Sequence, residues 1–282
     1  MTQRRSFTGA QGGRIAAEVL GEGPPVVLAH GGGQTRAAWT KVTRTLAKAG
    51  YQAIAIDMRG HGESEWSAAG AYHFIDFAAD LVGIAGQLEA RPALVGASLG
   101  GIAGLLAEGE LQPGVFSSLT LVDVTPQLQR EGVAHILGFM AAHLADGFAT
   151  ADEAAAAIGA YLPHRKQRGA SSTLDRYLRK CDDGRLRWHW DPRFIAAANT
   201  TPPDQASARF AAAARALRLP VHLIRGASSN LVTEDGARHF LQLAPHAAYS
   251  DIAGAGHMVV GDRNDAFTDA ILQFLRDRTP SS

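Results

Sequence analysis

The sequence lacks the features that would link it to disulfides, membranes or nucleic acid. It has one cysteine in 282 residues, so no internal disulfide can form and a reducing compartment is expected. No run approaches the roughly 18 consecutive apolar residues of a membrane span. The 27 basic residues equal the 27 acidic residues, so no charge excess favours nucleic acid or an anionic surface. Because residues 1–10 are polar and show no apolar signal core, we expect a cytoplasmic protein, with a homo-oligomer left open.

Motifs for metals and cofactors are also missing. The glycine run after the first strand reads GGGQTR, which matches neither the dinucleotide motif G-x-G-x-x-G nor a P-loop with its lysine. H-E-x-x-H, C-x-x-C and carboxylate clusters are absent from the sequence. We therefore expect neither a metal nor a cofactor. Dinucleotide binding is a disfavoured alternative, kept only because the next strand ends in Asp57 at a suitable spacing.

What the sequence does contain is a regular alternation of short apolar runs with helical stretches. Strands are predicted at residues 25–29, 52–56, 93–95, 119–122, 220–224 and 248–252, and helices at 39–49, 75–88, 101–108 and 266–276. Continuous rather than alternating apolar strands indicate buried strands of a parallel sheet. The predicted fold is therefore α/β, with a mostly parallel central sheet covered by helices on both faces. Residues 14–20 suggest an antiparallel pair at the edge of this sheet.

Residues 126–219 interrupt this alternation. They show no clear strand, and they contain alanine-rich segments around a polar middle. At roughly 90 residues the segment is too long for an ordinary connection. We predict that it is an inserted helical cap over a core formed by residues 1–125 and 220–282.

A serine lies between two glycines directly after one of the predicted strands. Gly96, Ser98 and Gly100 fit the G-x-S-x-G pattern, which occurs often by chance but here stands between a strand and a helix. In that context the serine could be a nucleophile on a strained turn. It could equally be the N-cap of the following helix. The motif alone leaves both interpretations open.

Two further segments favour the nucleophile. The loop after the strand 25–29 reads His-Gly-Gly-Gly, and the backbone N–H of Gly32 together with that of Leu99 could bind an oxyanion. His257 lies in a loop between the last predicted strand and the last helix, with Gly254 and Gly256 allowing a close approach. His257 is therefore the candidate general base for Ser98.

Four segments in this order resemble the α/β-hydrolase superfamily over nearly the whole chain outside the predicted cap. They are His30-Gly31, residues 57–64 (DMRGHGES), residues 96–101 (GASLGG) and residues 254–257 (GAGH). The resemblance implies a hydrolase with a nucleophile, a histidine and an acid, and scaffold roles for Asp57 and His61. The chain is similar to bacterial esterases, non-haem perhydrolases and small epoxide hydrolases. The last group uses an aspartate nucleophile, and the serine here argues against that chemistry.

The acid of the expected triad is the least defined member. Where such proteins carry an aspartate, the segment 225–232 (RGASSNLV) has Asn230. One explanation is that the acid has moved to Asp123, at the end of the strand 119–122. The other is that Asn230 orients His257 in a weakened enzyme, because an amide can accept from the ring but offers no charge. Asp251 is a poorer candidate because it lies within a strand.

The predicted substrate pocket combines Gly31, Trp188, Trp190 and Met258, although packing inside the cap explains the tryptophans equally well. Phe139, Met140 and His143 could belong to the same wall.

The sequence predicts a serine hydrolase that cleaves a small-molecule carboxylic ester or lactone through an acyl-Ser98 intermediate. The alternative is a non-hydrolytic use of the fold, either as a ligand-binding protein or as a cofactor-free oxygenase with His257 as base. Asn230 at the usual acid position motivates that alternative.

Overall fold

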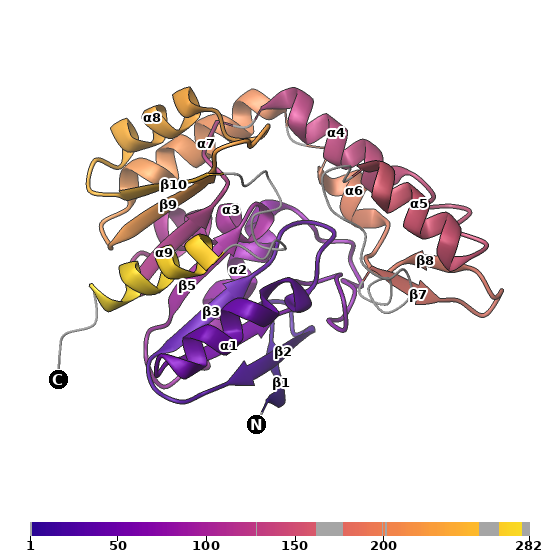
Figure 1. Ribbon diagram of the computed structural model, residues 1–282, viewed down its shortest axis with the longest axis horizontal. Helices are drawn as coiled ribbons and strands as arrows, with labels where there is room; N and C mark the ends of the chain where they lie inside the picture. The colour runs from indigo at the N-terminus through magenta and orange to yellow at the C-terminus, as the bar shows by residue number, and fades with distance from the viewer. Residues whose placement is uncertain are drawn as a thin grey trace.

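The computed structural model describes residues 2–127, 129–161, 177–198, 200, 202–253 and 265–277. Their central feature is an eight-stranded sheet with helices on both faces (Figure 1). Its strands are β1 (Gln3–Thr8), β2 (Arg14–Leu20), β3 (Pro25–Ala29), β4 (Gln52–Ile56), β5 (Ala93–Ala97), β6 (Ser118–Val122), β9 (Val221–Gly226) and β10 (Ala248–Ile252). They lie in the order β1-β2-β4-β3-β5-β6-β9-β10, and every pairing from β4 to β10 is parallel. The predicted α/β class is confirmed.

The edge of the sheet is antiparallel, as residues 14–20 indicated. β2 pairs with β1 on one side and with β4 on the other, both antiparallel. β1 was not predicted, because five of its six residues are polar or charged, and the same five are exposed. An edge strand with one solvated face carries little of the apolar signal that identifies buried strands.

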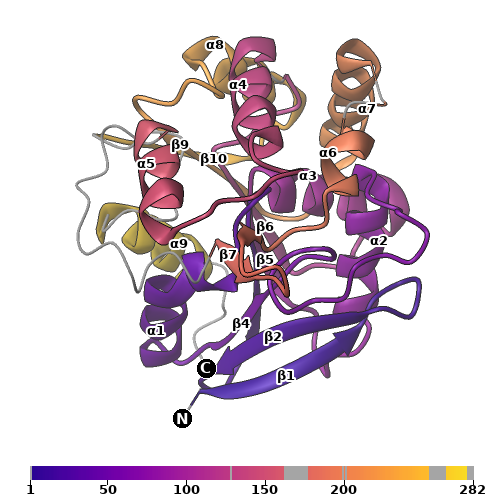
Figure 2. The same cartoon turned by 90° about the vertical axis from the view of Figure 1, so that its right-hand side faces the viewer.

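The alternation of side chains along each strand builds two separate cores. In β3, Val26 and Leu28 pack on one face of the sheet, and Val27 and Ala29 pack on the other. The first face is covered by α1 (Thr40–Lys48) and α9 (Asp265–Arg276), and the second by α2 (Phe74–Ala85), α3 (Leu99–Leu106), α7 (Pro203–Ala216) and α8 (Glu234–Leu243). Figure 2 shows α1 and α9 on one side of the strands and α2 and α3 on the other. None of the helices in the described residues is long and apolar enough to cross a membrane.

In the described part of the predicted insertion, three helices and one hairpin form a layer beside the sheet (Figure 1). We call this layer the cap; it consists of α4 (Arg130–Ala141), α5 (Ala151–Tyr161), α6 (Arg193–Ala198), β7 (Leu178–Lys180) and β8 (Leu186–Trp188). The hairpin corrects the expectation of no strand, since two three-residue strands rich in arginine and lysine leave no apolar run to detect.

Helix α7 lies within the range 126–219 but packs against helices of the core. Helix α7 contacts α3, α8 and the π-helical turn η2 (Ala107–Leu111). Phe210 of α7 is fully buried in this contact layer. The boundaries 126 and 219 therefore remain a prediction, and the cap as defined above ends before α7.

Candidate active site

Ser98 lies on a sharp turn between β5 and α3. Its backbone has φ 45° and ψ −109°, a conformation that costs a non-glycine residue on the order of 1–3 kcal/mol. The Ser98 N–H donates to the Val122 carbonyl at 3.1 Å. Its side chain makes no capping hydrogen bond to α3. Ser98 therefore occupies the N-cap position of α3, but among the described residues its hydroxyl does not cap the helix.

The glycines on either side of Ser98 are required by close backbone contacts. A Cβ atom on Gly96 would collide with the carbonyl group of Gly100. A Cβ atom on Gly100 would lie 2.7 Å from the carbonyl carbon of Ala29 in β3. Because backbone atoms of the sheet cannot move aside cheaply, any larger residue at these positions would strain the turn.

A cavity of about 390 Å³ opens over Ser98. Its polar floor includes Gly31, Gly32, Leu99 and Asp123. Its walls are largely apolar and come from α3, α4, α6 and the loop before α8, including Ile102, Val133, Leu137, Met140, Phe194 and Leu231. The cavity therefore joins one candidate nucleophile, one buried carboxylate and a chamber suited to apolar groups.

In the glycine loop after β3, the backbone N–H of Gly32 differs from those of Gly31 and Gly33, which both donate hydrogen bonds to side chains. The Gly31 N–H donates to the Gln34 side chain at 3.0 Å, and the Gly33 N–H donates to His61 Nε2 at 3.1 Å. Among the described residues, no acceptor is found for the N–H of Gly32 or for that of Leu99 at the start of α3. Both residues line the cavity beside Ser98. This arrangement could stabilise an oxyanion.

His30 and His61 connect this loop to the loop that follows β4. His30 Nε2 accepts from the Met58 N–H at 2.9 Å, and its Nδ1 lies 2.7 Å from the Gly31 carbonyl. His61 accepts from Gly33 N–H, and its Nδ1 lies 2.9 Å from the Arg59 carbonyl. A ring that accepts at one nitrogen and donates at the other is a neutral imidazole. Both histidines therefore serve as neutral bridges between backbone segments.

His189 of the cap makes the third such bridge. Its Nδ1 accepts from the Gly62 N–H at 2.8 Å, and its Nε2 lies 3.3 Å from the Gly33 carbonyl. Burial lowers the pKa of His61 to about 4 and the pKa of His189 to about 3. Burial and the neighbouring His61 lower the pKa of His30 well below its ordinary value. The cap is thus attached to the candidate oxyanion loop through an uncharged side chain.

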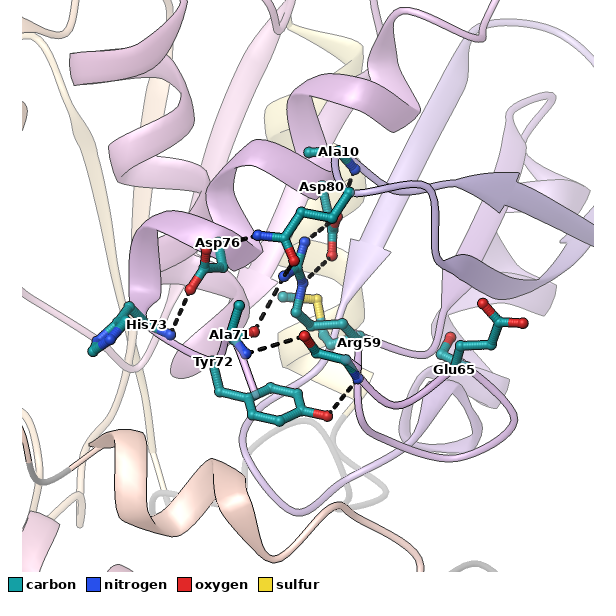
Figure 3. Close-up of polar contacts among 12 residues, drawn as sticks. Ala10, Arg59, Glu65, Ala71, Tyr72, His73, Asp76 and Asp80 are labelled. Carbon is teal, nitrogen blue, oxygen red and sulfur yellow. Dashed lines mark hydrogen bonds and ion pairs between the residues drawn. The ribbon is translucent and has the colours of Figure 1, made fainter. Parts of the chain in front are cut away.

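The segment 57–64 is held by two buried charges. Asp57 accepts from the backbone N–H groups of Arg36 at 2.7 Å and Glu63 at 2.9 Å, and it forms an ion pair with the Arg36 side chain. Arg59 forms two hydrogen bonds of 2.6 Å with Asp80 of α2 and one of 3.1 Å with the carbonyl of Ala71 (Figure 3). These contacts give Asp57 and Arg59 structural roles.

The two candidate acids occupy different surroundings. Asp123 follows β6 with φ 50°, is buried, and lines the cavity that contains Ser98. Asn230 is exposed, and it is not among the described residues that line the cavity. Asp251 of β10 is paired with Arg225 at 2.9 Å. Of the three side chains, only Asp123 shares the cavity with the serine.

The structure places the two tryptophans of the predicted pocket against each other. Trp188 and Trp190 are buried and stack on each other, with ring centroids 4.8 Å apart and planes 11° from parallel. Neither is among the described residues that line the cavity, because both rings pack inside the cap, where Trp188 also contacts Phe139 and Phe148. Gly31, Phe139 and Met140 do line the cavity.

Two predicted residues, His257 and Met258, lie outside the described residues. One cavity neighbour was missed: Ser229, whose hydroxyl donates to Asp123 at 2.6 Å. Its only sequence signal is its place next to Asn230. In the part of the chain that the structure describes, no group of three or more His, Cys, Asp or Glu side chains could hold a metal ion.

Comparisons with known proteins define the class. The family model of the alpha/beta hydrolase fold matches residues 24–263, so the chain belongs to this family. Esterase Rv0045c of Mycobacterium tuberculosis is 30% identical over 92% of this chain and 85% of its own length. The 3-hydroxybutyrate-oligomer hydrolase of Cupriavidus necator is 26% identical over 82% of each chain. The crystal structure of an E-2-(acetamidomethylene)succinate hydrolase matches with a TM-score of 0.82 at 23% identity, covering 98% of this chain and all of the other. The chain is a hydrolase of this fold.

Proposed function

We propose that this hydrolase cleaves carboxylic esters or lactones through an acyl intermediate on Ser98. The observation that carries the proposal is the cavity in which the strained Ser98, the Gly32 and Leu99 N–H groups and the Asp123 carboxylate come together. The esterase among the relatives supports ester bonds as the target.

In the first half of the reaction the Ser98 oxygen attacks the ester carbonyl carbon. His257 takes the hydroxyl proton, and the Gly32 and Leu99 N–H groups donate to the oxyanion. When the tetrahedral intermediate collapses, the C–O bond to the alcohol breaks and His257 returns the proton to the leaving oxygen. Asp123 orients the His257 ring and balances its positive charge. Water then attacks the acyl-Ser98 ester by the same route and releases the acid.

The apolar walls favour substrates whose acyl or alcohol part is uncharged. Val133, Leu137 and Met140 of α4 and Ile102 of α3 offer dispersion contacts but no partner for a carboxylate. An unpaired carboxylate would lose its hydration there. We expect 4-nitrophenyl hexanoate to react at least about 100-fold faster, by kcat/KM, than the mono-4-nitrophenyl ester of adipic acid, which has the same chain length. Equal rates would contradict this substrate preference.

Labelling with a fluorophosphonate followed by intact-protein mass spectrometry tests the nucleophile. The unmodified chain is expected to gain one phosphonyl group on Ser98, and Ser98→Ala is expected to gain none and to lose ester hydrolysis. Asp123→Asn is expected to slow both labelling and turnover, by up to about 10⁴-fold if it behaves as the triad acid of a serine protease.

Two results would overturn the proposal. Ester hydrolysis retained by Ser98→Ala would remove Ser98 as the nucleophile. No labelling of any variant, together with tight binding of an unreacted ester, would instead favour the non-hydrolytic alternative.

A further inference from the structure

Asp123 is held from one side by the last residue of β9 and by the loop that follows it. Its Oδ1 accepts from the Gly226 N–H at 3.0 Å, and its Oδ2 accepts from the Ser229 hydroxyl at 2.6 Å. Asp123 is 1% exposed, so both bonds are shielded from water. Two donors on two different oxygens fix the rotation of the carboxylate as well as its position.

Among the described residues, the hydrogen bonds of the Ser229 hydroxyl leave the Asp123 carboxylate as the acceptor of its proton. Its oxygen accepts from the N–H groups of Leu231 at 3.1 Å and Val232 at 3.2 Å. A serine hydroxyl has two lone pairs and one proton. Since backbone N–H groups occupy the acceptor positions, the proton points to Asp123. The distance of 2.6 Å is that of a hydroxyl donating to a charged oxygen.

The loop itself is clamped by a buried arginine. Arg225 Nε donates to the Val232 carbonyl at 2.7 Å, and its guanidinium also reaches the Ala227 carbonyl at 3.3 Å. The remaining end of the guanidinium pairs with Asp251 at 2.9 Å. The two ends of the loop that carries Ser229 are thus tied to one rigid side chain, and the hydroxyl is held in place before any substrate arrives.

We propose that Ser229 is a positioning residue that orients the Asp123 carboxylate toward the catalytic histidine; this rests on the proposed function. The segment 225–232, which the family resemblance marks as the place of the acid, supplies in this chain a hydroxyl donor to an acid on the neighbouring strand β6. This explains why Asn230 can stand at the usual acid position and point to solvent.

Ser229→Ala also leaves two backbone N–H groups without their acceptor, so a loss of activity alone would not separate positioning from stability. A double-mutant cycle with Asp123→Asn does separate them. Hydrolysis of 4-nitrophenyl hexanoate, split into kcat and KM, is measured for Ser229→Ala, Asp123→Asn and the double variant. Ser229→Thr keeps the hydroxyl, and Ser228→Ala changes an exposed neighbour of the same loop.

Loss of one hydrogen bond to a charged group predicts a kcat for Ser229→Ala that is lower by about 10- to 100-fold, with KM changed less than about threefold. Ser229→Thr is expected to keep most of the activity, and Ser228→Ala all of it. In the Asp123→Asn background, Ser229→Ala is expected to lower kcat by less than about twofold, because the bond that it removes already lacks its charged acceptor.

Additive losses in the cycle would overturn the positioning role, as would a Ser229→Ala variant as active as the unmodified chain. In both cases the labelled, active parent leaves the proposed function intact. A parent that neither hydrolyses the ester nor reacts at Ser98 would overturn the proposed function, and this inference with it.

Discussion

Acidification from pH 7 to pH 5 is expected to destabilise this protein through three buried histidines. His30, His61 and His189 each accept a backbone N–H at one ring nitrogen. Protonation would convert that acceptor into a donor facing another donor. Burial lowers the pKa of His61 to about 4 and that of His189 to about 3, and the pKa of His30 also lies well below the ordinary value of 6.5.

The magnitude follows from proton binding by the two states. In the unfolded chain the three rings titrate at about pH 6.5. In the folded protein burial keeps His61 and His189 neutral at pH 5 and disfavours the charged form of His30. The unfolded state therefore binds more protons, and stability is lost as the pH falls from about 6.5 toward the folded pKa values. Since pH 5 lies about 1.5 units below the unfolded pKa, His61 and His189 each account for a loss of about 2 kcal/mol. These two rings together remove roughly 4 kcal/mol, a large share of a typical folding free energy of about 5–15 kcal/mol, and His30 acts in the same direction.

Urea unfolding at pH 7 and pH 5, at one ionic strength, measures this loss. His189→Gln keeps an acceptor and a donor but cannot be protonated, so its loss between the two pH values should be smaller by about 2 kcal/mol. The exposed His239→Gln is the matched control and should behave as the parent does. A parent whose free energy of unfolding changes by less than about 2 kcal/mol would refute the reasoning, as would equal effects of the two substitutions.

Three further predictions concern the turn around Ser98 and the second candidate acid. Glycine adopts the positive φ of position 98 without strain, so Ser98→Gly should be more stable than Ser98→Ala by about 1 kcal/mol in urea unfolding. Both variants should be inactive. Equal stabilities would contradict backbone strain at Ser98. Gly100→Ala should lower the thermal midpoint by several degrees through its contact with β3, whereas Gly138→Ala, in open space on α4, should not. Asn230→Asp should have a kcat within about twofold of the unmodified chain. A sharp increase in kcat would indicate that position 230, and not Asp123, is the place of the triad acid.

The sequence alone was sufficient for the parallel strands of the central sheet and for the turn at Ser98. The buried parallel strands are continuous apolar runs, and each is bounded by glycine or a polar residue within a few positions. The Ser98 turn also has a local signature, because its glycines are needed for contacts made within or next to the turn itself. Elements without such a signature were missed: the polar edge strand β1 and the charged hairpin of the cap.

Only the tertiary structure decided which candidate acid shares a cavity with Ser98 and which side chains line that cavity. Asp123 meets Ser229 across 106 residues of sequence, and His189 meets Gly33 across 156. The stacking of Trp188 on Trp190 inside the cap likewise depends on where α4 and the hairpin come to lie. Local sequence determines strands, turns and helices because their hydrogen bonds and side-chain periodicity are short-range. The partner of a buried carboxylate depends on the packing of distant elements, and no local pattern of residues records it.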